Sequence, residues 1–362
     1  MSAISMLSEK ERLLRVLSRE EHDRPPVIAP GGMMSALTTD LLESHGIDGA
    51  RSMLDAEVMA QAATAARDAI GIENLGVPFC LTVEAEALGA DTSRGTSTVE
   101  PMCLQPALAS ARDVPSLKVP DPWRDRRMSQ VLLAVRLLKS RFIDVPIIGN
   151  LSGPVTLATS ILPCEDFLRL LLKDRTLARR IIEVARETIS SFGVAMIESG
   201  ADVITVSDPT ASGEIIGPRI FDTYFLPEYR DIFSRFHTAG ANTILHICGN
   251  VQSILPSIGG TGADAFSVDA VMGIRQLRKE LGSMPVMGNT STILLAQGTP
   301  RAIARVVRAA LSEGVDIAAP SCGLGRDTPL QNVRLMCEIV KTWERSQAGR
   351  RQDEGEGRGC TR

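Results

Sequence analysis

The sequence predicts a (β/α)8 TIM-like barrel preceded by an N-terminal helix, and two observations lead to this fold class. First, eight short β-rich runs alternate with longer helical patterns between about residue 25 and residue 322. Second, the runs from residue 145 onward are largely apolar, which is typical of parallel strands that are buried on both faces. The chain of 362 residues is long enough for one such barrel. A doubly wound parallel sheet is the alternative that this pattern leaves open.

The predicted strands are all short, and helical patterns or turns separate them. They cover residues 26–30, 77–82, 145–151, 202–207, 242–247, 263–268, 285–289 and 316–320. In a parallel barrel the carboxyl ends of all strands open at one face, and that face carries the active site. Polar residues at the ends of these runs are therefore the candidates for function.

Several helix boundaries are marked by residues that satisfy free backbone groups. The segments Ser8–Glu11 and Thr328–Gln331 match the capping-box pattern that starts a helix. Thr299, followed by a proline, predicts another helix start. Gly200 ends a helix that the apolar spacing predicts over residues 177–199.

The chain shows no internal repeat and no Pro- or Ser-rich linker, so we interpret residues 1–345 as a single domain. Residues 346–362 are polar, glycine-rich and free of aromatic residues. Such a composition cannot bury enough apolar surface to offset the entropy lost on ordering, so we expect a disordered tail there.

Composition excludes several classes of protein. The 39 basic and 43 acidic residues give a net charge of −4, which leaves no basic surplus for a nucleic-acid backbone. No run approaches the roughly 20 continuous apolar residues of a membrane span, and residues 1–15 lack a signal-peptide core. We therefore expect a cytoplasmic protein. Its seven cysteines, an odd number, do not form a disulfide framework and are available as thiolates.

Three residues predict a metal site at the strand ends. His246 and Cys248 are two residues apart at the end of the fifth predicted strand, so their side chains point to the same side. Cys322 follows the eighth predicted strand. One imidazole and two thiolates suit Zn²⁺ and leave a fourth position open. The alternative is that the cysteines are small buried residues and the histidine a core residue, but the matching strand-end positions favour the metal.

Four segments, which lie within residues 26–345, resemble one known superfamily. They are residues 77–89 (VPFCLTVEAEALG), 202–210 (DVITVSDPT), 244–250 (ILHICGN) and 319–328 (APSCGLGRDT). The sequence resembles the uroporphyrinogen decarboxylase superfamily and, within it, the zinc-dependent methylcobalamin:coenzyme M methyltransferases. This resemblance implies zinc held by His246, Cys248 and Cys322. It also implies methyl transfer from a methylated corrinoid, carried by a partner protein, to a thiol such as coenzyme M.

One departure bears on the choice within that superfamily. The decarboxylases carry an arginine-containing motif after their first strand, whereas residues 29–34 of this chain contain no arginine. A porphyrinogen would lose the main clamp for its carboxylates, so decarboxylation is the weaker hypothesis. A donor-side corrinoid methyltransferase, which demethylates a methoxy, methylamine or methylthio substrate, remains the main alternative. A metal-binding protein without catalytic activity is another.

Five further residues are candidates for the site. The resemblance implies an acidic residue that approaches the zinc at Asp269, which could equally cap the following turn. Glu84 lies in a matched segment and could act at the mouth, or be a solvated or helix-start carboxylate. Asp208 could orient His246, or cap its own turn. Asn150 and Asn289 end two predicted strands and are candidate contacts for substrate or cofactor.

Overall fold

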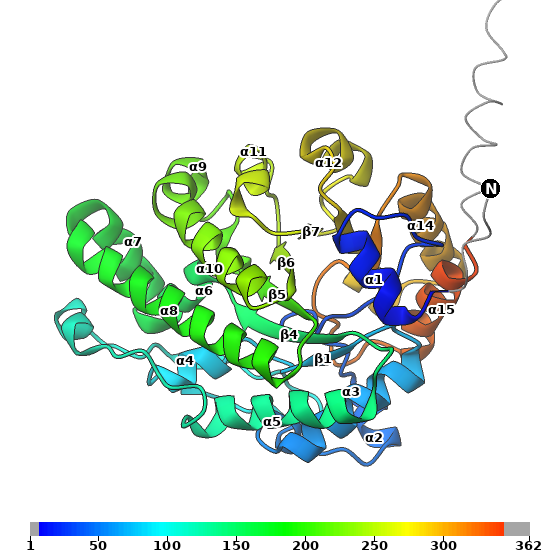
Figure 1. Ribbon diagram of the computed structural model, residues 1–362, viewed down its shortest axis with the longest axis horizontal. Helices are drawn as coiled ribbons and strands as arrows, with labels where there is room; N and C mark the ends of the chain where they lie inside the picture. The colour runs from blue at the N-terminus through cyan, green and yellow to red at the C-terminus, as the bar shows by residue number, and fades with distance from the viewer. Residues whose placement is uncertain (1–6, 344–362) are drawn as a thin grey trace, which may run out of the picture.

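The computed structural model describes residues 7–343 and shows an α/β fold with one curled parallel sheet (Figure 1). The strands follow the order β1-β4-β5-β6-β7-β8-β9 around the curl, and helices cover its outer side. Their bounds are Leu75–Val77 (β1), Ile147–Ser152 (β4), Val203–Ser207 (β5), Asn242–Ile247 (β6), Ala265–Val268 (β7), Val286–Thr290 (β8) and Ile317–Pro320 (β9). A separate antiparallel hairpin contains β2 (Asp91–Thr92) and β3 (Cys103–Gln105). The tail predicted over residues 346–362 lies outside the described residues.

The six strands predicted from residue 145 onward are confirmed, with ends that differ by two residues at most. The strand predicted over residues 77–82 is wrong. The observed strand, β1, ends at Val77, because the next residue is Pro78 and has no amide hydrogen to continue the ladder. Residues 79–82 instead lead into the short helix α4 (Val83–Ala87).

The first predicted strand, over residues 26–30, is reduced to one parallel bridge between Val27 and Ala318 of β9. Two of its residues are prolines, which cannot donate to a ladder. The segment nevertheless contacts both edges of the sheet. The Ile28 amide donates to the Ala318 carbonyl at 3.0 Å, and the Glu73 amide, just before β1, donates to the Val27 carbonyl at 2.8 Å. We call residues 26–30 the seam segment.

Fifteen α-helices lie among the described residues. They are α1 (Glu9–Leu17), α2 (Thr39–Ser44), α3 (Ala56–Ile70), α4, α5 (Arg126–Arg141), α6 (Pro154–Ile161), α7 (Cys164–Lys173), α8 (Arg175–Ser199), α9 (Gly217–Ile220), α10 (Leu226–Thr238), α11 (Leu255–Ile258), α12 (Ile274–Leu281), α13 (Thr292–Gln297), α14 (Pro300–Ser312) and α15 (Leu330–Lys341). Within residues 7–343, no helix combines the length and the apolar character that crossing a membrane requires.

Most of the predicted helix boundaries are confirmed. The Ser8 hydroxyl accepts from the Glu11 amide in a complete capping box, and the Thr299 hydroxyl accepts from the third residue of α14. Gly200 ends α8 in a left-handed conformation with φ of 115°. The capping box predicted at Thr328 is wrong, because α15 begins at Leu330 and no side chain caps it.

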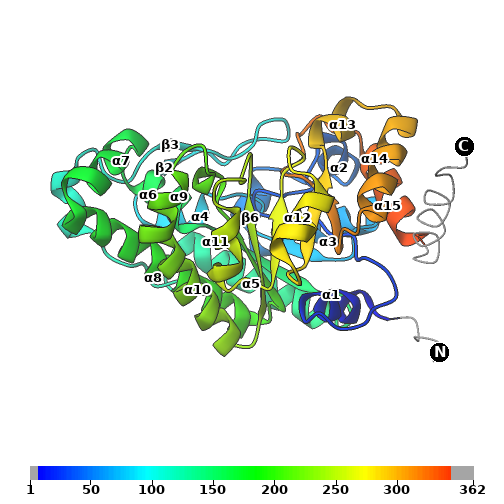
Figure 2. The same cartoon turned by 90° about the horizontal axis from the view of Figure 1, so that it is seen from above.

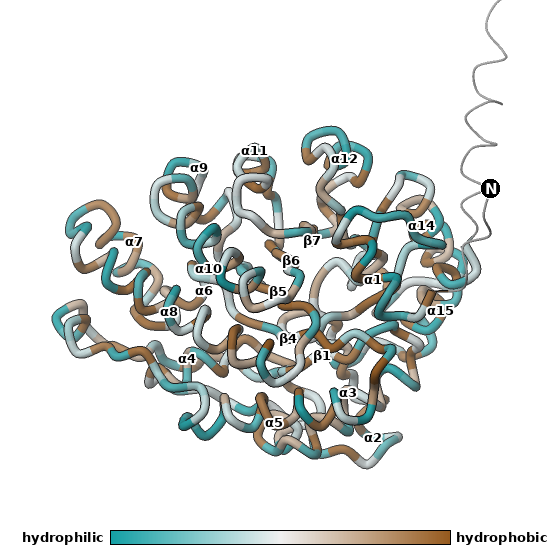
Figure 3. The backbone as a smooth tube through the Cα atoms, in the orientation of Figure 1, coloured by the Kyte–Doolittle hydropathy of each residue, from teal (hydrophilic) through white to brown (hydrophobic). Residues whose placement is uncertain are grey.

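The apolar core has two parts, one between the sheet and its outer helices and one inside the curl. Inside the curl, Leu13, Val16 and Leu17 of α1 pack against inward-facing strand residues such as Ile244. The Lys10 ammonium also lies 2.6 Å from the carboxylate of Asp202, which directly precedes β5. Helix α1 therefore covers the amino ends of the strands and leaves their carboxyl ends for a site (Figure 2). Figure 3 shows hydrophobic residues along β5 and β6.

Candidate metal centre

The three residues predicted to bind a metal lie together at the carboxyl ends of the strands. His246 is on β6, Cys248 directly follows β6, and Cys322 follows β9. The His246 Nε2 atom is 3.0 Å from the Cys248 sulfur, which is 3.0 Å from the Cys322 sulfur. All three ligand atoms lie within 4.8 Å of one another, and within residues 7–343 no other group of His, Cys, Asp or Glu meets this criterion. One imidazole and two sulfurs are a donor set that fits Zn²⁺.

The imidazole of His246 is held from its other side by Ser267. The side chain of His246 is fully buried, and its Nδ1 atom is 2.9 Å from the Ser267 hydroxyl on β7. The two residues are register partners in the parallel pair β6–β7. This contact fixes the ring so that Nε2 faces Cys248. Sequence reasoning missed Ser267, although its place in the strand next to β6 was the available signal.

The structure does not support the role suggested for Asp208. Its carboxylate accepts hydrogen bonds from the amides of Val155 and Thr156, which begin α6, and from the Tyr229 hydroxyl at 2.6 Å. The Asp208 carboxylate therefore caps α6, the helix that follows the neighbouring strand β4. It neither caps the turn after β5 nor contacts the imidazole of His246. Burial raises the pKa of Asp208, against the effect of these hydrogen bonds.

A hydrogen bond couples the pKa values of the two site thiols. Their hydrogen bond lowers the pKa of Cys322 and raises the pKa of Cys248, while burial raises both pKa values. The hydrogen bond and charge of His246, and the backbone amide of Gly323, further lower the pKa of Cys322. The thiolate therefore forms first on Cys322, and a bound cation would displace the remaining proton.

Asp269 lies beside the cluster but outside the set of three ligand atoms. It directly follows β7, is partly exposed, and accepts from the Gly249 amide at 3.1 Å and from the Val271 amide at 3.3 Å. The hydrogen bond from Val271 caps the turn, which is the alternative role that the sequence analysis gave for Asp269. The first bond links this carboxylate to the residue after Cys248.

Glu84 is neither solvated nor part of the wall of the cavity described below. It lies in the first turn of α4 with 1% of its surface exposed. Its Oε1 atom accepts from the Ser152 amide at 2.7 Å, whereas Oε2 finds no partner among the described residues. Burial raises the pKa of Glu84 to about 6, against that amide hydrogen bond.

The two asparagines hold backbone in place. Asn150 was a candidate contact for substrate or cofactor, but its buried amide nitrogen donates to the carbonyl of Pro30 at 2.6 Å and also to that of Val77 at 3.3 Å. It thereby ties β4 to the seam segment and to β1. Asn289 on β8 donates to the Met272 carbonyl at 2.6 Å and holds the loop that follows Asp269.

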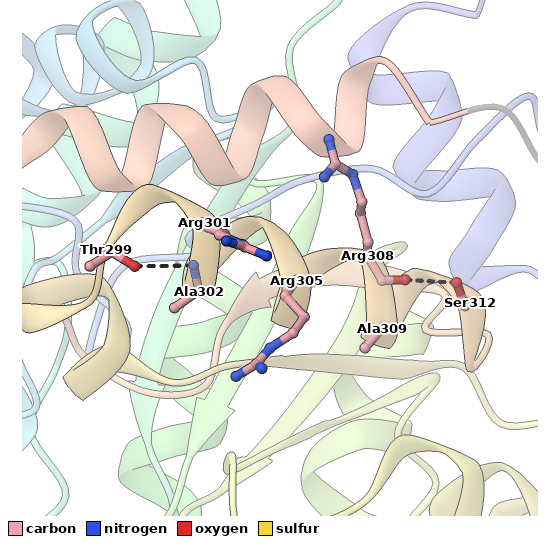
Figure 4. Close-up of a pocket in the computed structure, with 7 residues that line it drawn as sticks. All are labelled: Thr299, Arg301, Ala302, Arg305, Arg308, Ala309 and Ser312. Carbon is pink, nitrogen blue, oxygen red and sulfur yellow. Dashed lines mark hydrogen bonds between the residues drawn. The ribbon is translucent and has the colours of Figure 1, made fainter.

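A cavity of about 270 Å³ lies against the cluster. Met33 forms part of its wall, and the sulfur of Met33 is 3.9 Å from the Cys248 sulfur. Other wall residues include Cys80, Glu100, Met102, Ser160 and Arg326. A larger hollow of about 680 Å³ lies on α14 beside Arg301, Arg305 and Arg308 (Figure 4). None of the three cluster residues lines either cavity, but the smaller one reaches the cluster through Met33, whereas no wall residue of the larger hollow has a contact of this kind.

The fold and the cluster define a parallel α/β protein with one imidazole and two cysteine sulfurs gathered at the carboxyl ends of its strands, a set that could hold a metal ion. The model of the family "Uroporphyrinogen decarboxylase (URO-D)" matches residues 8–343, and the chain belongs to this family.

Relatives within this family have methyltransferase names. Methylcobamide:CoM methyltransferase MtaA of Methanosarcina barkeri is 32% identical over 340 residues, which are 92% of this chain and 97% of that protein. Methylcobamide:CoM methyltransferase MtbA of Methanosarcina acetivorans is 30% identical over 337 residues, which are 92% of this chain and 98% of that protein. The solved structure of a methyltransferase from Methanosarcina mazei superposes with a TM-score of 0.86 at 30% identity, over 92% of this chain and 98% of that one.

Proposed function

We propose that this chain transfers a methyl group from a methylated corrinoid to a thiol such as coenzyme M, at zinc held by His246, Cys248 and Cys322. The observation that carries this proposal is the three-ligand cluster at the strand ends, which adjoins a cavity of about 270 Å³. Relatives that match nearly the whole chain are named methylcobamide:CoM methyltransferases, and these names support a methylated corrinoid as the donor and coenzyme M as the acceptor.

The ligand set suits this chemistry because the thiolate, not the thiol, is the nucleophile. Zinc, when bound, would hold the acceptor as a thiolate at neutral pH. The two cysteines supply two negative charges that leave the acceptor sulfur electron-rich, and Ser267 keeps the imidazole of His246 in the orientation that binding needs. Asp269 is proposed as a displaceable carboxylate for the open position.

The reaction balances as a displacement at the methyl carbon. The acceptor thiol loses its proton to solvent, and its sulfur forms a bond to the methyl carbon while the cobalt–carbon bond breaks. The electron pair of that bond stays on cobalt, which changes from Co(III) to Co(I). The apolar residues of the mixed cavity wall, including Met33 and Met102, are proposed to orient the thiol.

The test is metal content together with thiol-dependent demethylation of methylcobalamin. We expect about one zinc per chain, lost in Cys248→Ala and Cys322→Ala together with the activity. Cys164→Ala is the matched control, because Cys164 is exposed on α7, outside the cluster. Full zinc retention in both site variants would contradict the ligand assignment.

X-ray absorption distinguishes the acceptor role from the donor-side alternative. Adding the thiol should raise the number of sulfur neighbours of zinc from about two to three and release about one proton per site. If no sulfur is added, and Co(I) corrinoid is instead methylated by a methoxy, methylamine or methylthio compound, the donor-side function holds. Decarboxylation of a porphyrinogen needs several cationic clamps, whereas Arg326 is the one cation of the cavity wall.

We also propose the finer architecture. The seam segment acts as the eighth strand, which closes the sheet into a TIM-like (β/α)8 barrel with α1 as an N-terminal helical extension. Its contacts with both sheet edges support this. Residues 1–345 are proposed to form one domain, in line with the family match over residues 8–343. The methylated corrinoid is proposed to arrive on a separate carrier protein.

A further inference from the structure

Arg326 is a buried cation with an unused hydrogen-bond donor. It follows Cys322 by four residues in the loop after β9, and 8% of its surface is exposed. Its Nη1 atom donates to the Leu37 carbonyl at 2.9 Å, whereas its buried Nε atom finds no acceptor among the described residues. Burying a guanidinium with an unsatisfied donor costs free energy. An acceptor supplied by a ligand would remove that cost.

The cavity beside the metal cluster is where such a ligand would bind. Arg326 forms part of its wall and is the one cationic residue there. The other buried arginine nearby is Arg127. It does not line the cavity, and its guanidinium donates hydrogen bonds to the side chains of Cys80, Thr82 and Glu86. Arg326 is therefore the cation that remains free to bind an anion from this cavity.

Glu100 limits how much negative charge the cavity accepts. It lies at the rim, before β3, and forms part of the same wall. Partial burial raises the pKa of Glu100, with a further rise from the charge of Cys322, while the charge of Arg326 lowers it. Glu100, Arg326 and Cys322 thus act on one another electrostatically. A ligand with one negative charge fits this pairing better than one with several.

We propose that Arg326 is the residue that selects the acceptor, by binding an acid group at the end of the acceptor away from its thiol. This inference rests on the proposed function, which places the sulfur end at the metal cluster. Arg326 is four positions after Cys322, so their Cα atoms lie at most about 14 Å apart, which favours a short acceptor. The planar guanidinium presents paired donors that match a sulfonate or a carboxylate.

The first experiment compares three thiols on the zinc-loaded protein by calorimetry: 2-mercaptoethanesulfonate, 3-mercaptopropionate and uncharged 2-mercaptoethanol. We expect the acid thiols to bind at least about 10-fold more tightly than the uncharged thiol. Arg326→Gln should weaken only the acid thiols, by about 10- to 100-fold, and Arg326→Lys should retain part of their affinity. Arg301→Gln, on α14 outside the cavity, is the control. Equal affinity for all three thiols, or equal weakening of all three in Arg326→Gln, would overturn the proposal.

A second variant covers the case in which Arg326→Gln fails to fold. Glu100 keeps a large part of its surface exposed and forms none of the core, so Glu100→Gln should fold normally. Because it removes the negative charge that opposes the acid group, it should tighten binding of both acid thiols about 2- to 5-fold at low salt and leave 2-mercaptoethanol unchanged. Unchanged or weaker binding of the acid thiols would contradict the proposal.

A third measurement separates this inference from the proposed function. Ethanesulfonate and propionate carry the acid but no thiol, so their binding, read by ligand-observed NMR, requires neither zinc nor corrinoid. Binding that Arg326→Gln abolishes would support the acid subsite even if methyl transfer is absent. Methyl transfer to thiols without Arg326-dependent acid binding would overturn the subsite and leave the function standing.

Discussion

The carboxylate of Glu84 should make the protein less stable as the pH rises through about 6. In the folded protein the pKa of Glu84 is about 6, because burial disfavours its charge, whereas its ordinary value is 4.5. The folded state therefore holds the proton more tightly than the unfolded state. The stabilising contribution is fully present below about pH 4.5 and is lost as the pH rises through about 6.

The size of the effect follows from the two pKa values. The difference between about 6 and 4.5 corresponds to about 2 kcal/mol of unfolding free energy, at about 1.4 kcal/mol per pKa unit, and this cost is fully developed at pH 7.5. At pH 5 the same two values leave a cost of less than about 1 kcal/mol. Glu84→Gln removes the titration. The unfolding free energy of the variant minus that of the natural protein should therefore be about 1 kcal/mol larger at pH 7.5 than at pH 5.

The measurement is urea unfolding of both proteins at pH 5 and pH 7.5, and the neighbouring Glu86→Gln is the control. Burial alone would raise the pKa of Glu86, but the charge of Arg127 and the hydrogen bond and charge of Arg94 outweigh it and lower that pKa. Ionised Glu86 is therefore stabilising above its ordinary pKa of 4.5, and Glu86→Gln should be less stable at both pH values. A Glu84→Gln stability difference that does not change between pH 5 and pH 7.5 would refute the reasoning.

Three further predictions concern the site and the fold. Ser267→Ala should weaken zinc binding about 10- to 100-fold in a chelator competition, because it frees the imidazole of His246, and unchanged affinity would count against that role. Gly76→Ala should destabilise the protein by about 3 kcal/mol in urea unfolding, since its Cβ would lie 1.7 Å from a backbone carbonyl oxygen; a neutral result would contradict the packing. Tyr229→Phe should raise the pKa of Asp208 further and cost about 1–3 kcal/mol of stability with zinc content unchanged; loss of zinc would instead show that Asp208 supports the site.

The sequence pattern predicted the strands and the face at which they end, because both depend on backbone hydrogen bonding. The apolar runs from residue 145 onward are strands, and because parallel strands end at one face, the positions of His246, Cys248 and Cys322 in these runs were enough to bring them together. The failures at residues 26–30 and 77–82 have one cause, since prolines there remove the donors that a ladder needs.

Side-chain partners across elements could not be predicted from the sequence. Asp208 and Asn150 sit at strand ends like the metal ligands, yet their polar atoms satisfy backbone groups of neighbouring elements. Strand register places Ser267 against His246, and a loop places Arg326 in the cavity wall, and neither placement leaves a local motif. Position at a strand end therefore identified candidates for the site, and only the hydrogen-bond partners separated site residues from structural ones.

The metal cluster and the cavity lie differently with respect to the seam segment. His246, Cys248 and Cys322 are carried by one unbroken ladder from β6 to β9, so the metal cluster does not cross the seam. The cavity does cross it, because Met33 and Cys80 stand on one side and Arg326 on the other. If the hydrogen bonds that join residues 26–39 to β9 and its following loop separated, among them Ile28 to Ala318 and Arg326 to Leu37, the cavity would widen while the ladder that carries the cluster stayed intact. Under the proposed function, we therefore expect acceptor entry and metal binding to depend on separate parts of the same sheet.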